Sequence, residues 1–263
     1  MRVLIKGAGD LASGIACRLS VCGMQIIMTE IQVPTTVRRM VAFSRAVYEK
    51  YAVVEGIRGC LVSDEKELEK VLGNNEIAVI VDPELHYMEW YQPDVLVDAI
   101  IAKKNTGTKI TDANLVIGVG PGFKAGEDCN YVVETKRGHN LGKVIWKGAA
   151  LPNTGIPGSI SGHTIDRIIR AEGTGLFVPI VQIGELVEVG QVVAVSGKTP
   201  IKAQISGMIR GMLQPGLMVE KGMKCGDIDP RCDIEQCMTV SDKARAVGGG
   251  VLEAIYRKEN SKE

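Results

Sequence analysis

An excess of charge of either sign is missing from this sequence, which has 31 basic and 31 acidic side chains among 263 residues. Such a balance provides no electrostatic footprint for nucleic acid or for an anionic membrane. No apolar run comes near the roughly 20 residues that a membrane-spanning helix needs. The chain begins with a strand-like segment and not with a charged leader, so we expect no signal peptide and a cytoplasmic protein.

Metal-ligand patterns are also missing. The chain has three histidines and seven cysteines, with no H-x-x-x-H and no C-x-x-C pair, so we expect no metal site. An odd number of scattered cysteines indicates reduced thiols sooner than disulfides. Cys225, Cys232 and Cys237 lie close in sequence but fit no metal finger. They are interpreted mainly as structural thiols, with redox or chalcogen chemistry as the alternative.

The most informative stretch is the first thirty residues. Arg2–Lys6 is a short apolar strand, and residues 7–14 (GAGDLASG) form a glycine-rich turn. Ile15–Val21 continues with helical spacing, and Gln25–Thr29 is a second apolar strand that ends at Glu30. Strand, glycine turn, helix, strand and acidic residue follow one another in this order in dinucleotide-binding proteins.

Each small residue in this turn has a physical role. Gly7 permits the tight turn, Gly9 permits close approach of backbone to a pyrophosphate, and Ala12 permits close packing of helix and strand. The helix start offers free N–H groups to phosphates, and Glu30 is placed to hold ribose hydroxyls, which favours NAD over NADP. The predicted cofactor-binding residues here are Gly7, Ala8, Gly9, Asp10, Leu11, Ala12 and Glu30. The alternative is that the glycines only form a turn, and the negative charge of Asp10 is unusual in a loop that holds an anion.

Further apolar strands follow, at residues 77–81, 95–101 and 115–119, with helices expected over 36–51 and 64–72. Alternating strands and helices indicate a doubly wound, largely parallel sheet, in which ligands bind beyond the carboxyl ends of the strands. Asp82 follows one of these strands. Gly118, Gly120 and Gly122 lie in a loop after another, and we expect that loop to approach the first glycine turn and to bind the cofactor.

A polar segment at residues 124–143 contains the candidate catalytic pair, Cys129 and His139. A thiol and an imidazole in contact can act as nucleophile and base. The alternative is an ordinary surface hairpin.

A glycine- and proline-rich connector at residues 151–162 leads to an internal repeat, in which residues 170–194 align with 202–226 at an offset of 32 without a gap. Each copy is too small to bury its own face, so we expect both to pack together about a pseudo-two-fold axis. The pattern resembles the barrel-sandwich hybrid of biotinyl and lipoyl domains, with residues 196–200 as the joining hairpin. Lys198 lies there but lacks the flanking residues that modifying enzymes read, so a scaffold or docking module is preferred to a carrier.

The tail at residues 240–258 is helical in pattern, with Ser241 or Asp242 at its start. Its middle contains Gly248, Gly249 and Gly250, each of which costs on the order of 1 kcal/mol relative to alanine in a helix. Either the helix is broken there, or backbone passes close to a ligand or to another element.

Several long motifs, GAGDLASG, GPGFKAGEDCNYVVETKRGHNLG, LPNTGIPG, KCGDIDPR and SDKARAVGGGVLEA, resemble YqeB-type accessory proteins of selenium-dependent molybdenum hydroxylases. The first domain is similar to that of XdhC-type maturation factors, although here no separate domain is found ahead of it. The resemblance implies a factor that binds an NAD-like dinucleotide or a molybdopterin nucleotide and serves an apo molybdenum hydroxylase or cofactor-maturation proteins, without nucleic acid or membrane and with a possible homo-oligomer. The alternative is an NAD-dependent oxidoreductase acting on a selenium- or sulfur-bearing intermediate.

These observations together predict an α/β protein with three parts. The first is a Rossmann-like nucleotide-binding domain over residues 1–160, and the second is an all-β barrel-sandwich hybrid over residues 165–230. A helical tail over residues 235–263 packs back on them.

Overall fold

The structure is a computed structural model that describes residues 1–155 and 158–260. Its residues divide into two compact units. Unit 1 contains Met1–Pro34, Ala42–Thr154 and Val240–Glu263, and unit 2 contains Thr35–Val41 and Gly155–Thr239.

Unit 1 is built on a nine-stranded sheet in the order β10-β9-β7-β6-β1-β2-β5-β4-β3. The seven strands from β9 to β4 in this order are parallel, and the edge strands β10 and β3 are antiparallel to their neighbours. The strands of unit 1, including the small separate pair β8 and β11, are β1 (Arg2–Lys6), β2 (Gln25–Glu30), β3 (Tyr51–Val54), β4 (Ile57–Val62), β5 (Ile77–Val81), β6 (Val95–Asp98), β7 (Leu115–Val119), β8 (Lys124–Ala125), β9 (Tyr131–Val133), β10 (Val144–Ile145) and β11 (Gly148–Ala149).

Helices flank this sheet. The longest are α6 and α1, and the others are short. The helices of unit 1 are α1 (Asp10–Val21), the 3₁₀ turn η2 (Phe43–Arg45), α2 (Ala46–Glu49), α3 (Glu65–Gly73), α4 (Met88–Tyr91) and α6 (Asp242–Asn260). Helix α3 begins as its sequence predicts, because the carboxylate of Asp64 accepts the N–H of Glu67 at 2.8 Å as an N-cap.

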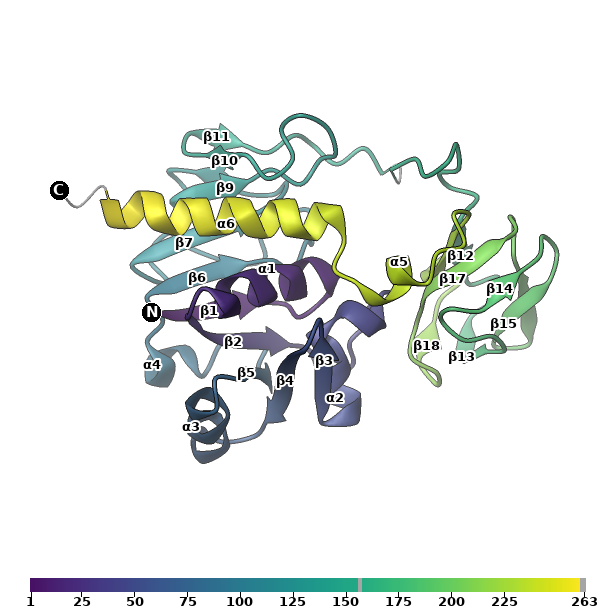
Figure 1. Ribbon diagram of the computed structural model, residues 1–263, viewed down its shortest axis with the longest axis horizontal. Helices are drawn as coiled ribbons and strands as arrows, with labels where there is room; N and C mark the ends of the chain where they lie inside the picture. The colour runs from purple at the N-terminus through teal and green to yellow at the C-terminus, as the bar shows by residue number, and fades with distance from the viewer. Residues whose placement is uncertain (156–157, 261–263) are drawn as a thin grey trace. The chain divides into compact units, whose positions relative to one another are not determined.

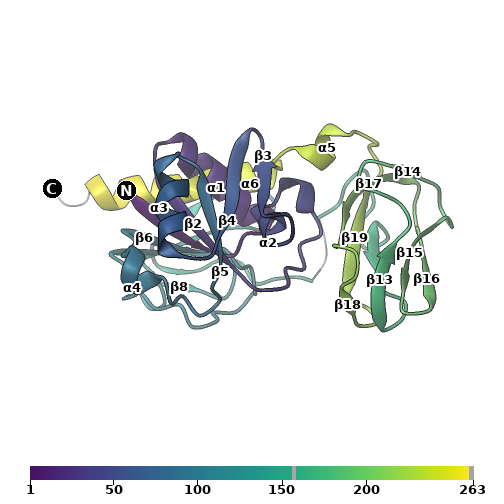
Figure 2. The same cartoon turned by 90° about the horizontal axis from the view of Figure 1, so that it is seen from below.

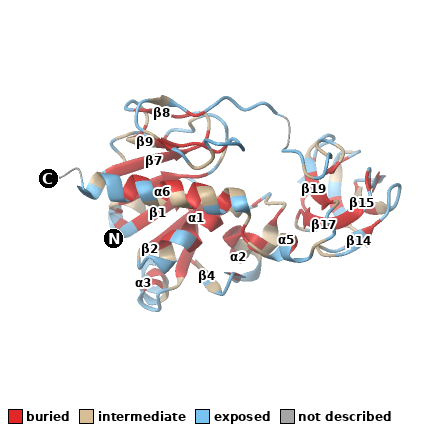
Figure 3. Cartoon of the chain, turned by 45° about the horizontal axis from the view of Figure 1, so that its top comes forward, coloured by how far each residue is buried: buried red, intermediate tan, exposed pale blue. Residues whose placement is uncertain are grey.

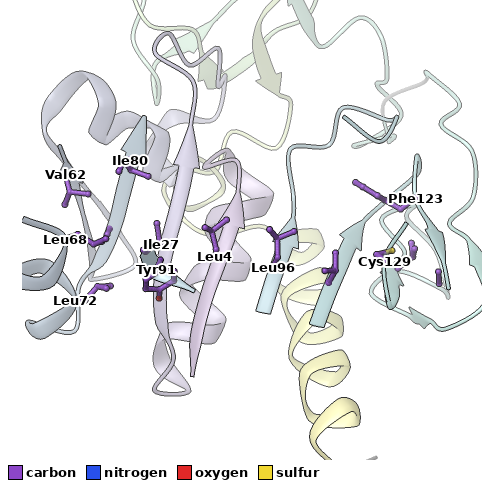
Figure 4. Close-up of a cluster of buried hydrophobic side chains, with 14 of the residues drawn as sticks. Leu4, Ile27, Val62, Leu68, Leu72, Ile80, Tyr91, Leu96, Phe123 and Cys129 are labelled. Atoms are coloured by element: carbon purple, nitrogen blue, oxygen red, sulfur yellow. The ribbon is translucent and has the colours of Figure 1, made fainter. Parts of the chain in front are cut away.

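One face of the sheet carries an extended apolar cluster (Figure 4). Leu4, Ile27 and Leu96 from the central strands are fully buried there, and Leu68 of α3 and Tyr91 of α4 pack into the same cluster. Alternate residues of the strands point to the other face, which α1 and α6 cover. The sheet is therefore buried on both faces, which accounts for the apolar runs that mark its strands in the sequence.

Helix α6 is continuous over 19 residues and lies beside α1 (Figures 1 and 3). A Cβ on Gly14 of α1 would lie 2.6 Å from the Cβ of Ala244, and a Cβ on Gly248 would lie 3.2 Å from the carbonyl oxygen of Gly14. The glycines of α6 therefore permit close helix packing. Of the two readings of the glycine triplet, the close approach of backbone to another element is confirmed and the broken helix is wrong.

Unit 2 contains two four-stranded sheets, ordered β12-β19-β17-β14 and β16-β15-β13-β18 (Figure 2). A shift of 32 residues carries β12–β15 onto β16–β19, and it converts the strand order of the first sheet into that of the second. Each sheet thus takes two strands from each copy of the repeat, which confirms the expected pseudo-two-fold arrangement. The elements of unit 2 are η1 (Arg39–Val41), β12 (Ile168–Arg170), β13 (Gly175–Pro179), β14 (Leu186–Val187), β15 (Val192–Ser196), β16 (Thr199–Lys202), β17 (Gly207–Met212), β18 (Met218–Val219), β19 (Lys224–Asp229) and α5 (Glu235–Met238).

The expected fold class, a Rossmann-like doubly wound sheet followed by a biotinyl- or lipoyl-type barrel-sandwich hybrid, is corrected to a mixed α/β protein with a large, mostly parallel sheet. Of the connections between parallel strands, only β1 to β2 and β4 to β5 contain an α-helix longer than four residues within the described chain. The connection from β6 to β7 contains no helix, and α6 reaches the sheet from the far end of the sequence. A regular alternation of strand and helix is therefore not what covers this sheet.

The helix expected over residues 36–51 is also wrong. The segment forms η1, η2 and the four-residue α2, and it passes from unit 2 into unit 1 at Ala42. Its apolar residues face two different cores, so a helix-like spacing arises without one continuous helix.

Candidate functional site

The glycine turn after β1 lies where the strand order reverses, with β2 on one side of β1 and β6 on the other. Gly7 has φ +89°, a left-handed conformation that favours glycine, and its N–H donates to the carbonyl of Thr29 at 2.9 Å. A Cβ on Gly7 would lie 3.2 Å from the Cα of Ile100, in the loop that follows β6. The turn and that loop therefore meet at the switch point, the usual ligand-binding place of an open parallel sheet.

Glu30, at the end of β2, turns back onto the glycine turn. Its Oε2 accepts the N–H of Ala8 at 3.1 Å, and its Oε1 accepts the N–H of Ile31 at 2.9 Å. Burial raises the pKa of this carboxyl, and the two backbone hydrogen bonds oppose the shift. Glu30 was expected to hold a ligand's ribose, but both of its oxygens already hold backbone N–H groups.

Helix α1 begins at Asp10 without a side-chain cap. Its N-cap is Gly9, at φ −68° and ψ −178°, an extended backbone that any residue adopts. Serine, threonine and aspartate are preferred at this position, because their side chains accept the first N–H groups. Leu11 and Ala12 lie in this first turn, so their N–H groups point to the carboxyl edge of the sheet.

Lys243 of α6 brings a positive charge to this helix start. Burial lowers the pKa of its ammonium, and the carboxylate of Asp10 opposes that shift most strongly among the nearby charges. Asp10 thus has a cationic neighbour that sequence inspection missed, because the two residues lie more than 200 positions apart. A half-buried cation beside uncapped N–H groups is an arrangement suited to an oxyanion.

A buried polar triad lies directly beneath the turn. The ammonium of Lys6 donates to Thr108 Oγ1 at 2.7 Å and lies 3.2 Å from Asp98 Oδ2, and the hydroxyl of Thr108 donates to the same carboxylate at 2.6 Å. All three side chains are buried. Lys6 and Asp98 end β1 and β6, so the triad ties together the two strands that flank the switch point. The sequence signal was a charged residue at the end of each apolar strand.

The loop after β7 follows a strand that β6 separates from β1. Local packing contacts account for its three glycines. A Cβ on Gly118 would overlap the ring of Phe123. A Cβ on Gly120 would lie 2.8 Å from Thr135 Oγ1, and one on Gly122 would lie 2.6 Å from the backbone of Lys104. These contacts explain the glycines without a ligand.

Cys129 and His139 lie in different surroundings. Cys129 is fully buried in the apolar cluster shown in Figure 4, and burial raises the pKa of its thiol to about 11. His139 is exposed. A thiol held protonated in a hydrophobic core is not an activated nucleophile.

Two other residues that the sequence suggested as candidates, Asp82 and Lys198, lie outside the glycine turn. Asp82 is buried and accepts the backbone N–H groups of His86 and Tyr87 at 2.9 Å. Lys198 is exposed in the hairpin between β15 and β16. Among residues 1–155 and 158–260, no group of three or more histidine, cysteine or acidic side chains could hold a metal ion. None of the helices within these residues combines the length and the hydropathy that a membrane-spanning helix requires.

Comparison with known proteins gives one strong match. The chain is 48% identical over 253 residues to the "Uncharacterized protein YqeB" of Escherichia coli (strain K12), a match that covers 96% of this chain and 47% of that protein. The expected YqeB-type resemblance is therefore confirmed over most of the chain, which spans about half the length of this relative. No protein-family model matches.

Solved structures match only weakly. An aspartoacylase family protein from Mesorhizobium loti is 11% identical at a TM-score of 0.27, covering 86% of this chain and 84% of that one. A succinylglutamate desuccinylase/aspartoacylase from Rhodobacter sphaeroides is 15% identical at a TM-score of 0.28, covering 86% and 85%. The ectoine utilization protein EutE from Ruegeria pomeroyi is 21% identical over 32% of this chain and 27% of that one, at a TM-score of 0.22. Likenesses this low give this chain no activity.

These findings correct the expected function and cofactors. The YqeB relative is titled as uncharacterised, and the match with it does not support a role with molybdenum hydroxylases. The expected molybdenum-cofactor maturation factor and its alternative, an NAD-dependent oxidoreductase, are therefore withdrawn, together with NAD and molybdopterin as cofactors. The geometry agrees, since Glu30 is engaged by backbone and Cys129 is buried. The partners, an apo molybdenum hydroxylase or cofactor-maturation proteins, stay a prediction.

Proposed function

We propose that this protein binds a small oxyanion, free or as part of a larger molecule, at the carboxyl edge of the unit 1 sheet. The observation that carries the proposal is the uncapped start of α1 at the switch point of the sheet. The site consists of the glycine turn and first helical turn, Gly7–Ala12, with Lys243 as the counter-charge. The proposal concerns the anionic group and does not extend to a dinucleotide or a molybdenum cofactor.

The chemistry of the site favours an acceptor with negative charge. Backbone N–H groups at a helix start and the helix dipole both favour an anion there. The carboxylates of Glu30 and Asp10 are already engaged, Glu30 by two N–H groups and Asp10 by its electrostatic contact with Lys243. Their charge is therefore partly balanced within the protein, and an oxyanion that approaches the helix start meets N–H donors and an ammonium.

Titration calorimetry with inorganic phosphate and with pyrophosphate tests the proposal, with chloride as the reference anion. We expect saturable binding to the wild-type chain. Lys243→Met should weaken it about tenfold, equivalent to ~1.4 kcal/mol, because a partly buried charge-assisted contact is lost. Lys258→Met removes a lysine from the other end of the same helix and should leave the affinity unchanged.

Gly9→Asp provides a second, independent test. An aspartate at the N-cap supplies the missing cap, so the variant should fold with unchanged or slightly raised stability while its carboxylate displaces the anion. Gly73→Asp adds the same charge at an exposed helix end where a Cβ meets nothing within 4 Å, and binding should persist. Absence of binding to the wild type, or equal binding by the Gly9→Asp and Gly73→Asp variants, would refute the proposed site.

A further inference from the structure

One cavity of unit 1 lies along the last two turns of α6, a helix that packs on β9 and β10 (Figure 1). Its volume is about 560 Å³, which is within the range of small-molecule sites. The lining residues are Tyr131, Trp146, Glu253, Tyr256, Arg257 and Asn260. Along α6, Lys243 at the oxyanion site is ~15 Å from Glu253, at 1.5 Å per residue. The cavity is therefore separate from the oxyanion site.

Aromatic residues gather at this cavity although the chain has few of them. The whole sequence contains two tryptophans and six tyrosines. One tryptophan and two tyrosines line the cavity, and we call Tyr131, Trp146 and Tyr256 the aromatic cluster. They come from the start of β9, the turn between β10 and β11, and α6. Trp146 is 61% exposed and Tyr256 is 53% exposed, so ring surface is open to a ligand. The face of an aromatic ring is electrically negative and attracts cations.

A cation of the protein itself already lies on this cluster. The guanidinium carbon of Arg257 is 5.0 Å from the centre of the Trp146 ring. Glu253, one helical turn earlier, pairs with the same guanidinium at 2.7 Å. The side chains of Arg257 and Glu253 are 47% and 48% exposed, and an ion pair this exposed costs little to separate. The ring and the carboxylate thus form a place for a positive charge, which a solvent-exposed side chain fills.

The other groups of the cavity also favour a cation. Beside Arg257, Glu253 carries the one formal charge of the lining residues, and the remaining four are uncharged. The site lies at the carboxyl end of α6, where the helix dipole favours positive charge. Two lysines are close in sequence, but Lys147 is exposed to solvent and Lys258 lines a different cavity. Glu253 and the rings are therefore the groups that a ligand in this cavity would contact.

We propose that this cavity binds an organic cation of the quaternary-ammonium class, which displaces the Arg257 guanidinium from Trp146 and pairs with Glu253. Aromatic residues are the usual means by which proteins recognise such cations. A primary ammonium is strongly hydrated and loses more on leaving water, so a methylated ammonium is favoured. Its methyl groups can contact rings on several sides, whereas a planar guanidinium stacks on one ring at a time.

Proton NMR of choline, titrated with the full chain at constant ionic strength, tests the proposal. We expect the N-methyl signal to move upfield in a saturable way, because protons over an aromatic face are shielded by the ring current. The alcohol in which a carbon atom replaces the nitrogen of choline has the same shape without the charge. It should bind at least about twofold more weakly, because the cation–π contribution is lost.

Arg257→Gln gives the most specific result, because it removes the resident cation and leaves all three rings. Choline should bind this variant about two- to fivefold more tightly than the wild type. Arg245→Gln removes the same charge near the other end of α6, from a side chain that is 51% exposed, and should leave the affinity unchanged. Trp146→Leu should lose the binding, with its fold checked by circular dichroism and melting temperature.

Three outcomes would overturn the assignment. The first is a choline signal that moves with neither the wild type nor Arg257→Gln. The second is equal binding of choline and the uncharged alcohol, which would indicate a merely apolar pocket. The third is weaker binding by Arg257→Gln, which would show that the arginine holds the ligand. Each leaves the oxyanion site standing, because that site is tested with phosphate and with variants of other residues.

Discussion

Replacing Gly250 by alanine is expected to destabilise unit 1, whereas the same change at Gly249 is expected to stabilise it. Both glycines lie inside α6, where alanine is favoured over glycine by about 1 kcal/mol. A Cβ on Gly249 meets nothing within 4 Å. A Cβ on Gly250 would overlap the carbonyl oxygen of Gly142 and would lie 2.8 Å from a methyl group of Val133. Neighbouring positions in one helix thus carry opposite expectations.

The size of the destabilisation follows from the kind of atom that the new Cβ would contact. Overpacking of a core costs about 1–3 kcal/mol, and a backbone carbonyl cannot rotate aside, so the upper end of this range applies to Gly250→Ala. Subtracting the helix preference leaves a net loss of ~2 kcal/mol, against a gain of ~1 kcal/mol for Gly249→Ala. The two variants should therefore differ by ~3 kcal/mol, or roughly 6–12 °C in melting temperature for a chain of this size.

Tryptophan fluorescence during urea unfolding is the suitable assay, because both tryptophans of the chain, Trp90 and Trp146, belong to unit 1. The signal therefore reports the unit that contains α6 and not the β sheets of unit 2. If Gly250→Ala proves as stable as Gly249→Ala, the close approach of α6 to Gly142 is not rigid, and the packing explanation for the glycines is wrong.

Two further predictions concern buried polar groups. Asp98→Ala should lower the free energy of unfolding by about 3–5 kcal/mol, because the Lys6 ammonium is then buried without its carboxylate. Lys6→Met/Asp98→Leu should recover most of this loss, as measured by urea unfolding. Equal stabilities of the single and double variants would contradict the prediction. Burial raises the thiol pKa to about 12 for Cys17 and to about 11 for Cys129 and Cys225, so the folded chain keeps protons that the unfolded chain releases near pH 9. The free energy of unfolding should therefore be unaffected below pH 9 and fall as the pH rises toward 11, less steeply in Cys129→Ala, and a flat profile over this range would show that these thiols do not contribute.

Local pattern was sufficient for much of unit 1. The strands at Arg2–Lys6, Gln25–Glu30 and Ile77–Val81 are buried on both faces, so an apolar run marks each of them in the sequence. The helix at Glu65–Gly73 has both a cap and an amphipathic pattern. The repeat of unit 2 was found because equivalent glycines recur at one offset. In each case the information lies within a few neighbouring residues.

Contacts between residues far apart in the sequence could not be predicted from these local patterns. The glycines of α6 look like helix breakers until Gly14 and Gly142 are placed beside them. The Lys6–Asp98 pair and the neighbourhood of Asp10 and Lys243 join residues that are far apart in the chain. The candidate pair of Cys129 and His139 was close in sequence, and the burial of Cys129 could not be read from its neighbours. The carboxyl edge of the sheet was the expected site, but its charged groups come from elements that no short motif connects.

Helices α1 and α6 pack together in unit 1 although they lie far apart in the sequence, and this has a consequence for synthesis of the chain. On the ribosome, α1 and the first strands emerge early, whereas α6 emerges only after the whole of unit 2 has been made. Until then the groove around Gly14, which α6 will fill, faces water or chaperones, and the nascent sheet is covered on that face by α1 alone. The sheets of unit 2 need both copies of the repeat. Unit 2 can form in this interval as an insertion that does not disturb α1 and the first strands of unit 1. Slowing translation between residues 155 and 240 should therefore lengthen the life of an aggregation-prone intermediate, and supplying α6 as a separate peptide should shorten it.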